Sequence, residues 1–253
     1  MGHFIDLLIV FTIREIKTRY RGALLGPLWV VLYPLALTGV TTMVFSVFLH
    51  RQIHAIPFPV FALSGFVFWS FFTNSISFAT KSLIWNRDLV TKTRFPRLVI
   101  PLSMVFARLV DLIISLIVFL CLVIITHTKI QPQSVLIFLF FIFQVLFTCG
   151  ISVFFALLRA MFRDVEHILD FVLLLWFYIT PIAYPESVIP TKYAWLISIN
   201  PMATYISIYR RLLFSGDILW NFNIIYTLVI SIIIFTGGIL FFLKTDKKID
   251  DFI

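Results

Sequence analysis

Long apolar runs and short polar stretches alternate along most of the chain. A helix needs roughly 20 consecutive apolar residues to cross a hydrocarbon core of about 30 Å. Runs of about this length predict six transmembrane helices at 27–49, 59–80, 101–126, 134–158, 167–184 and 222–243. The fifth run is the shortest and ends in TPIAYP, where Pro181 and Pro185 interrupt regular helix. The pattern therefore predicts an all-α membrane protein with a single transmembrane domain over residues 1–253.

Composition agrees with this pattern. Of the 253 residues, 61% are hydrophobic and only 13% are charged, whereas soluble domains are about 25% charged. In so apolar a chain, the formal net charge of +8 indicates cytoplasmic loops rather than a surface for nucleic acid. We therefore expect no nucleic-acid partner.

The distribution of lysine and arginine predicts the orientation. With six spans, one side receives Arg14, Lys17, Arg19, Arg21, Lys81, Arg87, Lys92, Arg94, Arg97, Arg108, Arg159, Arg163, Lys244, Lys247 and Lys248. The other side receives Arg51, Lys129, Lys192, Arg210 and Arg211. The positive-inside rule makes the first side cytoplasmic. Both termini, including the tail 244–253, are predicted to be cytoplasmic.

The segment 1–22 precedes the first span and ends in basic residues. A helix over 4–21 has an apolar side and a basic side, as in helices that lie in the membrane interface. The apolar side comprises Ile5, Leu8, Ile9, Ile13, Ile16 and Tyr20, and the basic side comprises Arg14, Lys17 and Arg21. Gly22 and Gly26 permit backbone angles closed to other residues, and Pro27 suits the first turn of a new helix. The segment is either an interface helix followed by a glycine elbow or an ordinary basic flank.

The loop 81–100 is basic but keeps apolar residues among its charges, namely Leu83, Ile84, Leu89, Val90 and Phe95. A short amphipathic helix that ends near Phe95, before Pro96, would present these residues to the bilayer surface or to a partner protein. Both alternatives remain open at the level of the residues.

The segment 185–220 is too polar and too rich in proline to span a membrane. Two short helices separated at Asn200–Pro201 are predicted, lying at or dipping into the outer interface. Its aromatic residues are candidates for an interfacial belt or for the lining of an exit path: Tyr193, Trp195, Tyr205, Tyr209 and Trp220.

Several motifs, in order and spacing, resemble the transmembrane permease subunits of bacterial ABC exporters for O-antigen, capsular polysaccharide and teichoic acid. They are REIKTRYRGALLGPLWVVLYPL, SGFVFWSFFTNSISFATKSLIWNRDLVTKTRFPRLVIPL, FRD at 162–164, TPIAY at 180–184 and INPMATYISIYRRLLFSGD at 199–217. The resemblance covers nearly the whole chain. It implies a multi-pass protein of the bacterial inner membrane that exports a lipid-linked polysaccharide.

The resemblance also implies partners. Six spans are half of what such exporters use, so a second copy of the chain is expected, together with two ATP-binding subunits that bind ATP and Mg. No cofactor is expected in this chain, and it is not expected to be an enzyme: none of its nine glycines precedes Lys, so no phosphate-binding GxxxxGK loop is present.

The resemblance assigns roles to three segments. The interface helix and the coupling loop 81–100 would contact the ATPase through Arg14, Lys17, Arg87, Asp88, Leu89, Lys92 and Arg94. Gly22, Gly26 and Pro27 would form the elbow between the interface helix and the first span. The segment 185–220 would be a pair of outer re-entrant helices.

Sugar rings pack on aromatic side chains, and a sliding polymer benefits from many weak, flat contacts. Candidates to line the conduit are Trp29, Tyr33, Trp69, Phe72, Trp176, Tyr178 and Tyr184. Most of the 30 phenylalanines are expected to face lipid or fill helix interfaces.

Other chemical signals are weak. His50 and His54 have no third metal ligand nearby, and Cys121 and Cys149 lie inside spans as apolar residues. Arg108 and Asp111 are expected to pair, and Glu166 and Asp170 are expected to pair with Arg159 or Arg163.

Three alternatives to polysaccharide export remain. The first is an ABC exporter of another amphipathic substrate such as a lipid or drug. The second is an intramembrane transferase acting on a lipid-linked sugar, and the third is a multi-span assembly protein. A transferase would need converging ionisable groups at depth, and the spans supply chiefly Ser, Thr, Asn74 and Gln144.

Overall fold

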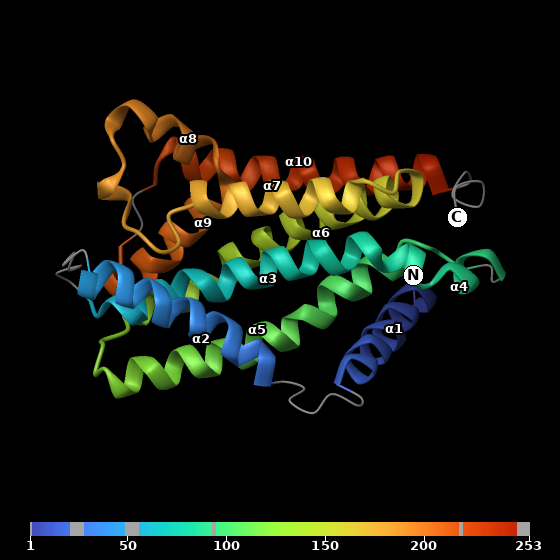
Figure 1. Ribbon diagram of the computed structural model, residues 1–253. Coiled ribbons are helices and arrows are strands. Elements are labelled where there is room, and N and C mark those ends of the chain that lie inside the picture. Colours follow the sequence, from blue (N-terminus) through green and yellow to red (C-terminus); the bar gives the residue numbers. More distant parts are fainter. Residues whose placement is uncertain (1, 21–27, 49–55, 93–94, 218–219, 247–253) are drawn as a thin grey trace.

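The computed structural model describes residues 2–20, 28–48, 56–92, 95–217 and 220–246, and every regular element within these ranges is a helix. The long helices lie side by side as a bundle, and the remaining short helices lie at its two ends (Figure 1). The predicted all-α class is therefore confirmed for the described residues.

Five helical segments are long and apolar enough to span a membrane. They are α2 (Leu28–Thr42, continued by the π-helical turn η1, Met43–Phe48), α3 (Phe58–Trp85), α5 (Val99–Ile125), α6 (Ile137–Met161, preceded by η2, Pro132–Leu136) and α10 (Phe222–Thr245). They correspond to the first four and the last of the predicted spans.

The predicted fifth span, 167–184, is shorter in the structure. Helix α7 covers Val165–Ile179, which is 15 residues, or about 22 Å at 1.5 Å per residue. It ends where it does because proline has no N–H for helical pairing and disfavours helix in the preceding residue, here Thr180 before Pro181.

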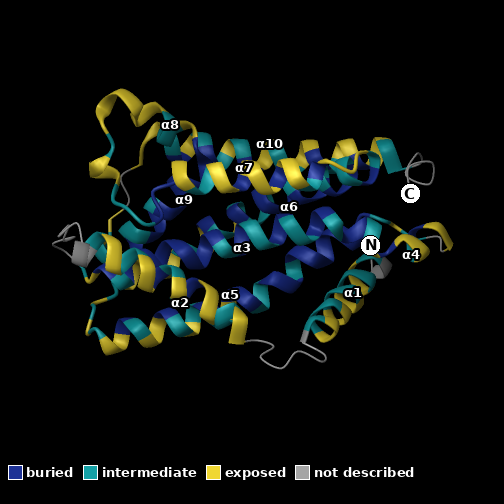
Figure 2. Ribbon diagram, viewed as in Figure 1, coloured by how far each residue is buried: buried dark blue, intermediate teal, exposed yellow. Residues whose placement is uncertain are grey.

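Helix α3 is the centre of the bundle. In its most apolar stretch 83% of the residues are buried, against 11% for α2 and 22% for α10. Figure 2 shows the same contrast, with α3 largely buried and exposed stripes on α2 and α7. Aromatic packing holds the centre: Phe72 stacks on Phe147 at 5.8 Å between centroids, and Trp176 meets both rings edge-on.

Helices α6 and α10 approach each other closely at two glycines. A Cβ atom at Gly150 would collide with the backbone at Ile234, and one at Gly238 would collide with the carbonyl oxygen of Gly150. Small residues of this kind allow transmembrane helices to pack backbone against backbone.

The segment between α7 and α10 contains η3 (Glu186–Val188), η4 (Thr191–Tyr193), α8 (Ala194–Ile199), α9 (Pro201–Arg210) and η5 (Arg211–Ser215). Two short helices with a break at Asn200 were predicted, and α8 and α9 confirm this. The break is stabilised because Asn200 Oδ1 accepts hydrogen bonds from the amides of Met202 and Ala203 at 3.0 and 3.3 Å.

The aromatic residues of this segment fall into an exposed group and a buried group. Tyr193, Trp195 and Trp220 are exposed, but Tyr205 and Tyr209 are fully buried. Their hydroxyls pair inside the bundle, Tyr205 with Ser231 at 2.6 Å and Tyr209 with Gln144 at 2.7 Å. The prediction was wrong for these two because α9 packs among α3, α6 and α10 instead of lying on the surface.

The opposite end of the bundle carries α1 (Gly2–Tyr20), α4 (Arg87–Lys92) and the end of α10 (Figure 1). Helix α1 packs on α5 and leaves Ile5, Ile9 and Ile13 exposed. The elbow residues Gly22, Gly26 and Pro27 lie outside the described residues.

Candidate functional site

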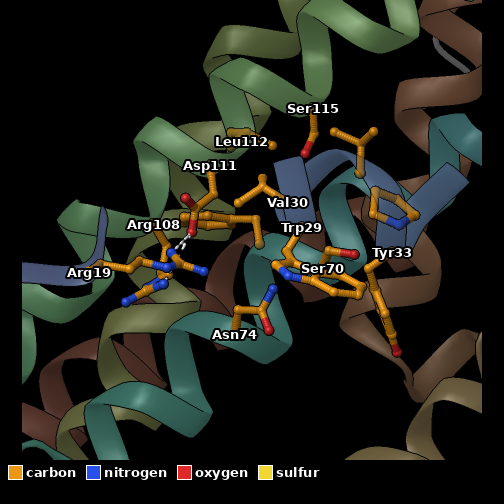
Figure 3. A pocket seen from close by; sticks show the side chains of 13 residues that line it. Arg19, Trp29, Val30, Tyr33, Ser70, Asn74, Arg108, Asp111, Leu112 and Ser115 are labelled. Atoms are coloured by element: carbon orange, nitrogen blue, oxygen red, sulfur yellow. Dashed lines mark hydrogen bonds and ion pairs between the residues drawn. The ribbon is translucent and has the colours of Figure 1, made fainter. Parts of the chain in front are cut away.

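Two cavities open between α2 and its neighbours, and they share Tyr33 and Ser70 in their linings. The first, which we call the arginine cavity, has a volume of about 360 Å³ and receives side chains from α1, α2, α3 and α5. Figure 3 shows Trp29 and Tyr33 of α2, Ser70 and Asn74 of α3, and Arg108, Asp111 and Ser115 of α5 around it.

The arginine cavity holds an ion-paired cluster. Arg108 Nη1 lies 3.2 Å from Asp111 Oδ2, as predicted from their spacing, and Arg19 of α1 also pairs with Asp111. The Arg108 guanidinium lies 3.9 Å from the centroid of the Phe78 ring. Pairing and a cation–π contact lower the cost of placing these charges inside the bundle, and they attach α1 to α5.

The second cavity, which we call the tyrosine cavity, has a volume of about 320 Å³ and lies between α2, α3 and α7. Its aromatic lining comprises Tyr33, Trp69, Phe177 and Tyr178. Its polar lining comprises Ser70, Thr73, Ser77 and Asp170. Flat rings and hydrogen-bonding groups therefore face the same space, a combination that suits ligands with both apolar and polar faces.

The predicted conduit residues separate into two groups. Trp29, Tyr33, Trp69 and Tyr178 line the two cavities. Trp29, Tyr33 and Tyr178 are nevertheless 62%, 60% and 66% exposed, so the arginine cavity is open beside α2, and the tyrosine cavity is open beside α2 and α7.

The other three candidates lie elsewhere. Phe72 is completely buried in the centre of the bundle. Trp176 donates from Nε1 to Asn200 Oδ1 at 2.8 Å and lines a separate outer cavity of about 260 Å³ with Trp195. The hydroxyl of Tyr184 donates to the carbonyl oxygen of Tyr178 at 2.7 Å.

Apart from Arg94, the predicted coupling residues lie on α1 and α4, at one end of the bundle. Arg87, Asp88 and Lys92 are exposed on α4, while Val90 is buried and anchors it. Lys92 donates to Asp88 at 2.9 Å, and this hydrogen bond and charge hold the pKa of the Asp88 carboxyl below its ordinary value.

Helix α1 contacts the beginning of this loop. Arg14 Nη2 donates to Asn86 Oδ1 at 3.0 Å, and Phe11 stacks on Phe95 at 5.5 Å between centroids. Lys17 is exposed, Leu89 is half-buried, and Arg94 lies outside the described residues. The structure therefore joins α1 and the loop 81–100 into one surface.

A charged cluster links three helices at the same end. Glu166 of α7 lies 3.2 Å from Arg159 of α6, as predicted, and 2.8 Å from Lys81 of α3. The Lys81 contact was not predicted, because it joins residues far apart in sequence. Asp170 pairs with neither predicted arginine and lines the tyrosine cavity instead.

Arg210 is a residue whose role the sequence did not indicate. It was predicted to lie among the basic residues of the non-cytoplasmic side, but its guanidinium points into the bundle. It donates to the carbonyl oxygens of Pro181 and Phe61 at 2.6 and 3.0 Å, to that of Ile182, and to Ser64 Oγ at 3.3 Å. One side chain thus ties α9 to α3 and to the turn after α7.

Metal or thiol chemistry finds little support in the described part of the chain. No group of three or more His, Cys, Asp or Glu side chains gathers there in a way that could hold a metal ion. His50 and His54 lie outside the described residues. Cys149 is buried and Cys121 is exposed on α5.

The long apolar helices are those of a polytopic membrane protein, and two cavities lie beside α2. Residues 6–214 match the family described as ABC-2 type transporter. The chain belongs to this family and is the membrane component of a transporter.

Curated relatives carry more specific names. The chain is 35% identical over 243 residues to an O-antigen export system permease protein RfbA of Klebsiella pneumoniae, covering 95% of this chain and 90% of that protein. It is 34% identical over 217 residues to an RfbA of Myxococcus xanthus, covering 83% and 80%. It is 25% identical over 226 residues to the polysialic acid transport protein KpsM of Escherichia coli, covering 87% and 86%.

Proposed function

We propose that this chain is the permease subunit of an ATP-driven exporter that moves a lipid-linked, O-antigen-like polysaccharide from the cytoplasm across the inner membrane. The observation that carries the proposal is the pair of adjoining cavities, where aromatic rings and hydrogen-bonding groups share one lining. The names of the relatives support the choice of a polysaccharide over a lipid or a drug.

The open side of the cavities supports a two-fold assembly. Polar side chains such as serine and aspartate are unfavourable against lipid tails. Ser77 and Asp170 nevertheless line a cavity that is open beside exposed residues of α2 and α7. A second copy packed against this side would enclose a conduit between the two chains. Helix α7 would then serve as a short sixth span of each copy, and α8 and α9 as re-entrant helices at the outer mouth.

The end that carries α1 and α4 would face the cytoplasm and bind two ATP-binding subunits, which would supply ATP and Mg. Arg14, Lys17, Arg87, Asp88 and Lys92 would contact them, with Leu89 and Arg94 in the same loop. Movement of the ATPase would reach the spans through α1, its elbow and α3, because α4 follows α3 after a single residue.

The proposal is tested by truncating aromatic side chains that line the cavities. Tyr33→Ala and Tyr178→Ala are expected to reduce polysaccharide export several-fold while expression and assembly with the ATPase are retained, because sugar–ring contacts are lost. Export is measured as surface polysaccharide in cells that lack their own permease gene. Tyr226→Ala, on α10 and outside both cavities, is the matched control. Wild-type export by both cavity variants would remove the cavities from the transport path.

A further inference from the structure

The tyrosine cavity has one polar wall whose function is not explained by packing. Ser70, Thr73 and Ser77 occupy positions i, i+3 and i+7 of α3 and therefore lie on one face of that helix. Elsewhere α3 is buried by its neighbours, but this face lines the cavity. Opposite it, α7 supplies Asp170, which is exposed.

Asp170 differs from the other acidic residue of α7. Glu166 is held by Lys81 and Arg159, whereas Asp170 forms no ion pair or hydrogen bond with the side chains of the described residues. It lies four residues beyond Glu166, about 6 Å further along the axis of α7. An unpaired carboxylate in a membrane helix is costly unless it faces water or a ligand, and such residues are functional candidates.

The side chains of this wall keep most of their hydrogen-bonding capacity. The Thr73 hydroxyl donates to the carbonyl of Trp69 at 3.1 Å and keeps its acceptor capacity. Ser70 and Ser77 form no side-chain hydrogen bond within the described ranges. The wall can therefore offer a carboxylate and three hydroxyl groups to a molecule in the cavity.

We propose that the tyrosine cavity is a carbohydrate subsite that selects a neutral, hydroxyl-rich stretch of the transported chain. Sugar hydroxyls donate to Asp170 and exchange hydrogen bonds with Ser70 and Ser77, while Tyr33 and Tyr178 pack against the ring faces. A carboxylated sugar is disfavoured because its charge would face Asp170. An acyl chain leaves the carboxylate and hydroxyls without partners. The inference rests on the proposed export function and deepens it.

The test uses the assembled complex of this chain with its ATP-binding subunit in lipid nanodiscs. Two photoreactive probes are compared, a lipid-linked neutral oligomannoside and the same molecule with carboxylated sugars. Wild-type complex is expected to label with the neutral probe about tenfold more than with the carboxylated probe, a ratio within reach of one charge-assisted contact. Asp170→Asn is expected to remove most of that preference, because an amide no longer repels a carboxylate.

Asp164→Asn is the matched control, since it removes a carboxylate from the exposed start of the same helix, outside the cavity. It is expected to keep the wild-type labelling ratio. Thr73→Val, which replaces a hydroxyl by a methyl group of similar size, is expected to lower neutral labelling while leaving the charge preference intact.

Each outcome bears on a different claim. An unchanged ratio in Asp170→Asn, with wild-type complex that exports polysaccharide, would overturn this inference and leave the proposed function standing. Disulfide formation between two copies of Asp170→Cys would also overturn it, because the side chain would then contact the second copy. Absence of both labelling and export in the wild type would overturn the proposed function and this inference with it.

Discussion

At the scale of single residues, the buried amides Gln144 and Asn200 are each paired with groups on other helices. Gln144 accepts from Tyr209 and donates to the carbonyl of Phe68 at 3.2 Å. Asn200 accepts from Trp176 and donates to Thr180 Oγ1 at 2.9 Å. Because water does not supply partners in a membrane, these bonds fix how α6, α7 and α9 sit relative to one another.

Arg210 allows a direct test of this principle. Replacement by Met removes the donor that Arg210 supplies to the carbonyls of Pro181 and Ile182, so Arg210→Met is expected to destabilise the purified protein by about 2 kcal/mol or more. The effect is read as a lower midpoint of thermal unfolding in detergent. Lys offers donors from one point only, so Arg210→Lys should restore part of the loss.

The neighbouring Arg211 provides the control, because it forms no side-chain hydrogen bond to the described residues. Arg211→Met is expected to unfold close to the wild-type midpoint. Equal midpoints for the two Met variants would show that the contacts of Arg210 do not stabilise the outer end.

At the scale of helices, the sequence predicts what depends on local pattern. The five long spans follow from apolar runs of sufficient length, and the break between α8 and α9 follows from Asn200–Pro201. Tyr205 and Tyr209 were assigned to the surface because periodicity identifies the helix but not the helices that cover it. The contacts of Lys81 with Glu166 and of Arg210 with Pro181 join distant segments, and no local pattern reports them.

The candidate site divides in the same way. Four of the conduit candidates, chosen because they are aromatic and lie in predicted spans, line the cavities: Trp29, Tyr33, Trp69 and Tyr178. Phe72 and Trp176 share that type and position but lie in the core and beside Asn200. Tertiary packing decides which face of a span meets a cavity. A single sequence does not contain this information.

The crossing of α6 and α10 gives a prediction at this scale. Gly238→Ala is expected to destabilise the protein by about 1–3 kcal/mol, because its methyl group would collide with the backbone of Gly150. Gly237→Ala is the control, since nothing lies within 4 Å of a Cβ atom there and alanine favours helix over glycine by about 1 kcal/mol. Thermal unfolding followed by fluorescence-detected size exclusion measures both. Similar midpoints for the two variants would contradict close packing at this crossing.

At the scale of the whole molecule, charge and aromatic surface are separated along the bundle. One end carries the exposed charges of α1 and α4, and the middle carries the cavities that open beside α2 and α7. The other end carries α8 and α9, and Arg210 and Asn200 attach this segment to the bundle. This division suits a subunit that receives force at one end and guides a polymer past its side.

The division predicts that force transmission can be separated from hydrolysis. Arg87 is exposed on α4 and forms no side-chain ion pair within the described residues, so Arg87→Glu alters the contact surface without disturbing the fold. In the proposed complex with the ATP-binding subunit, this variant is expected to retain ATP hydrolysis but to lose most polysaccharide export. Both rates are measured in proteoliposomes.

Arg163→Glu reverses an exposed charge in the loop between α6 and α7 at the same end and should preserve coupling. Equal coupling in the two variants, or cross-links that place Arg87 far from the ATPase, would exclude α4 as the element that receives the force.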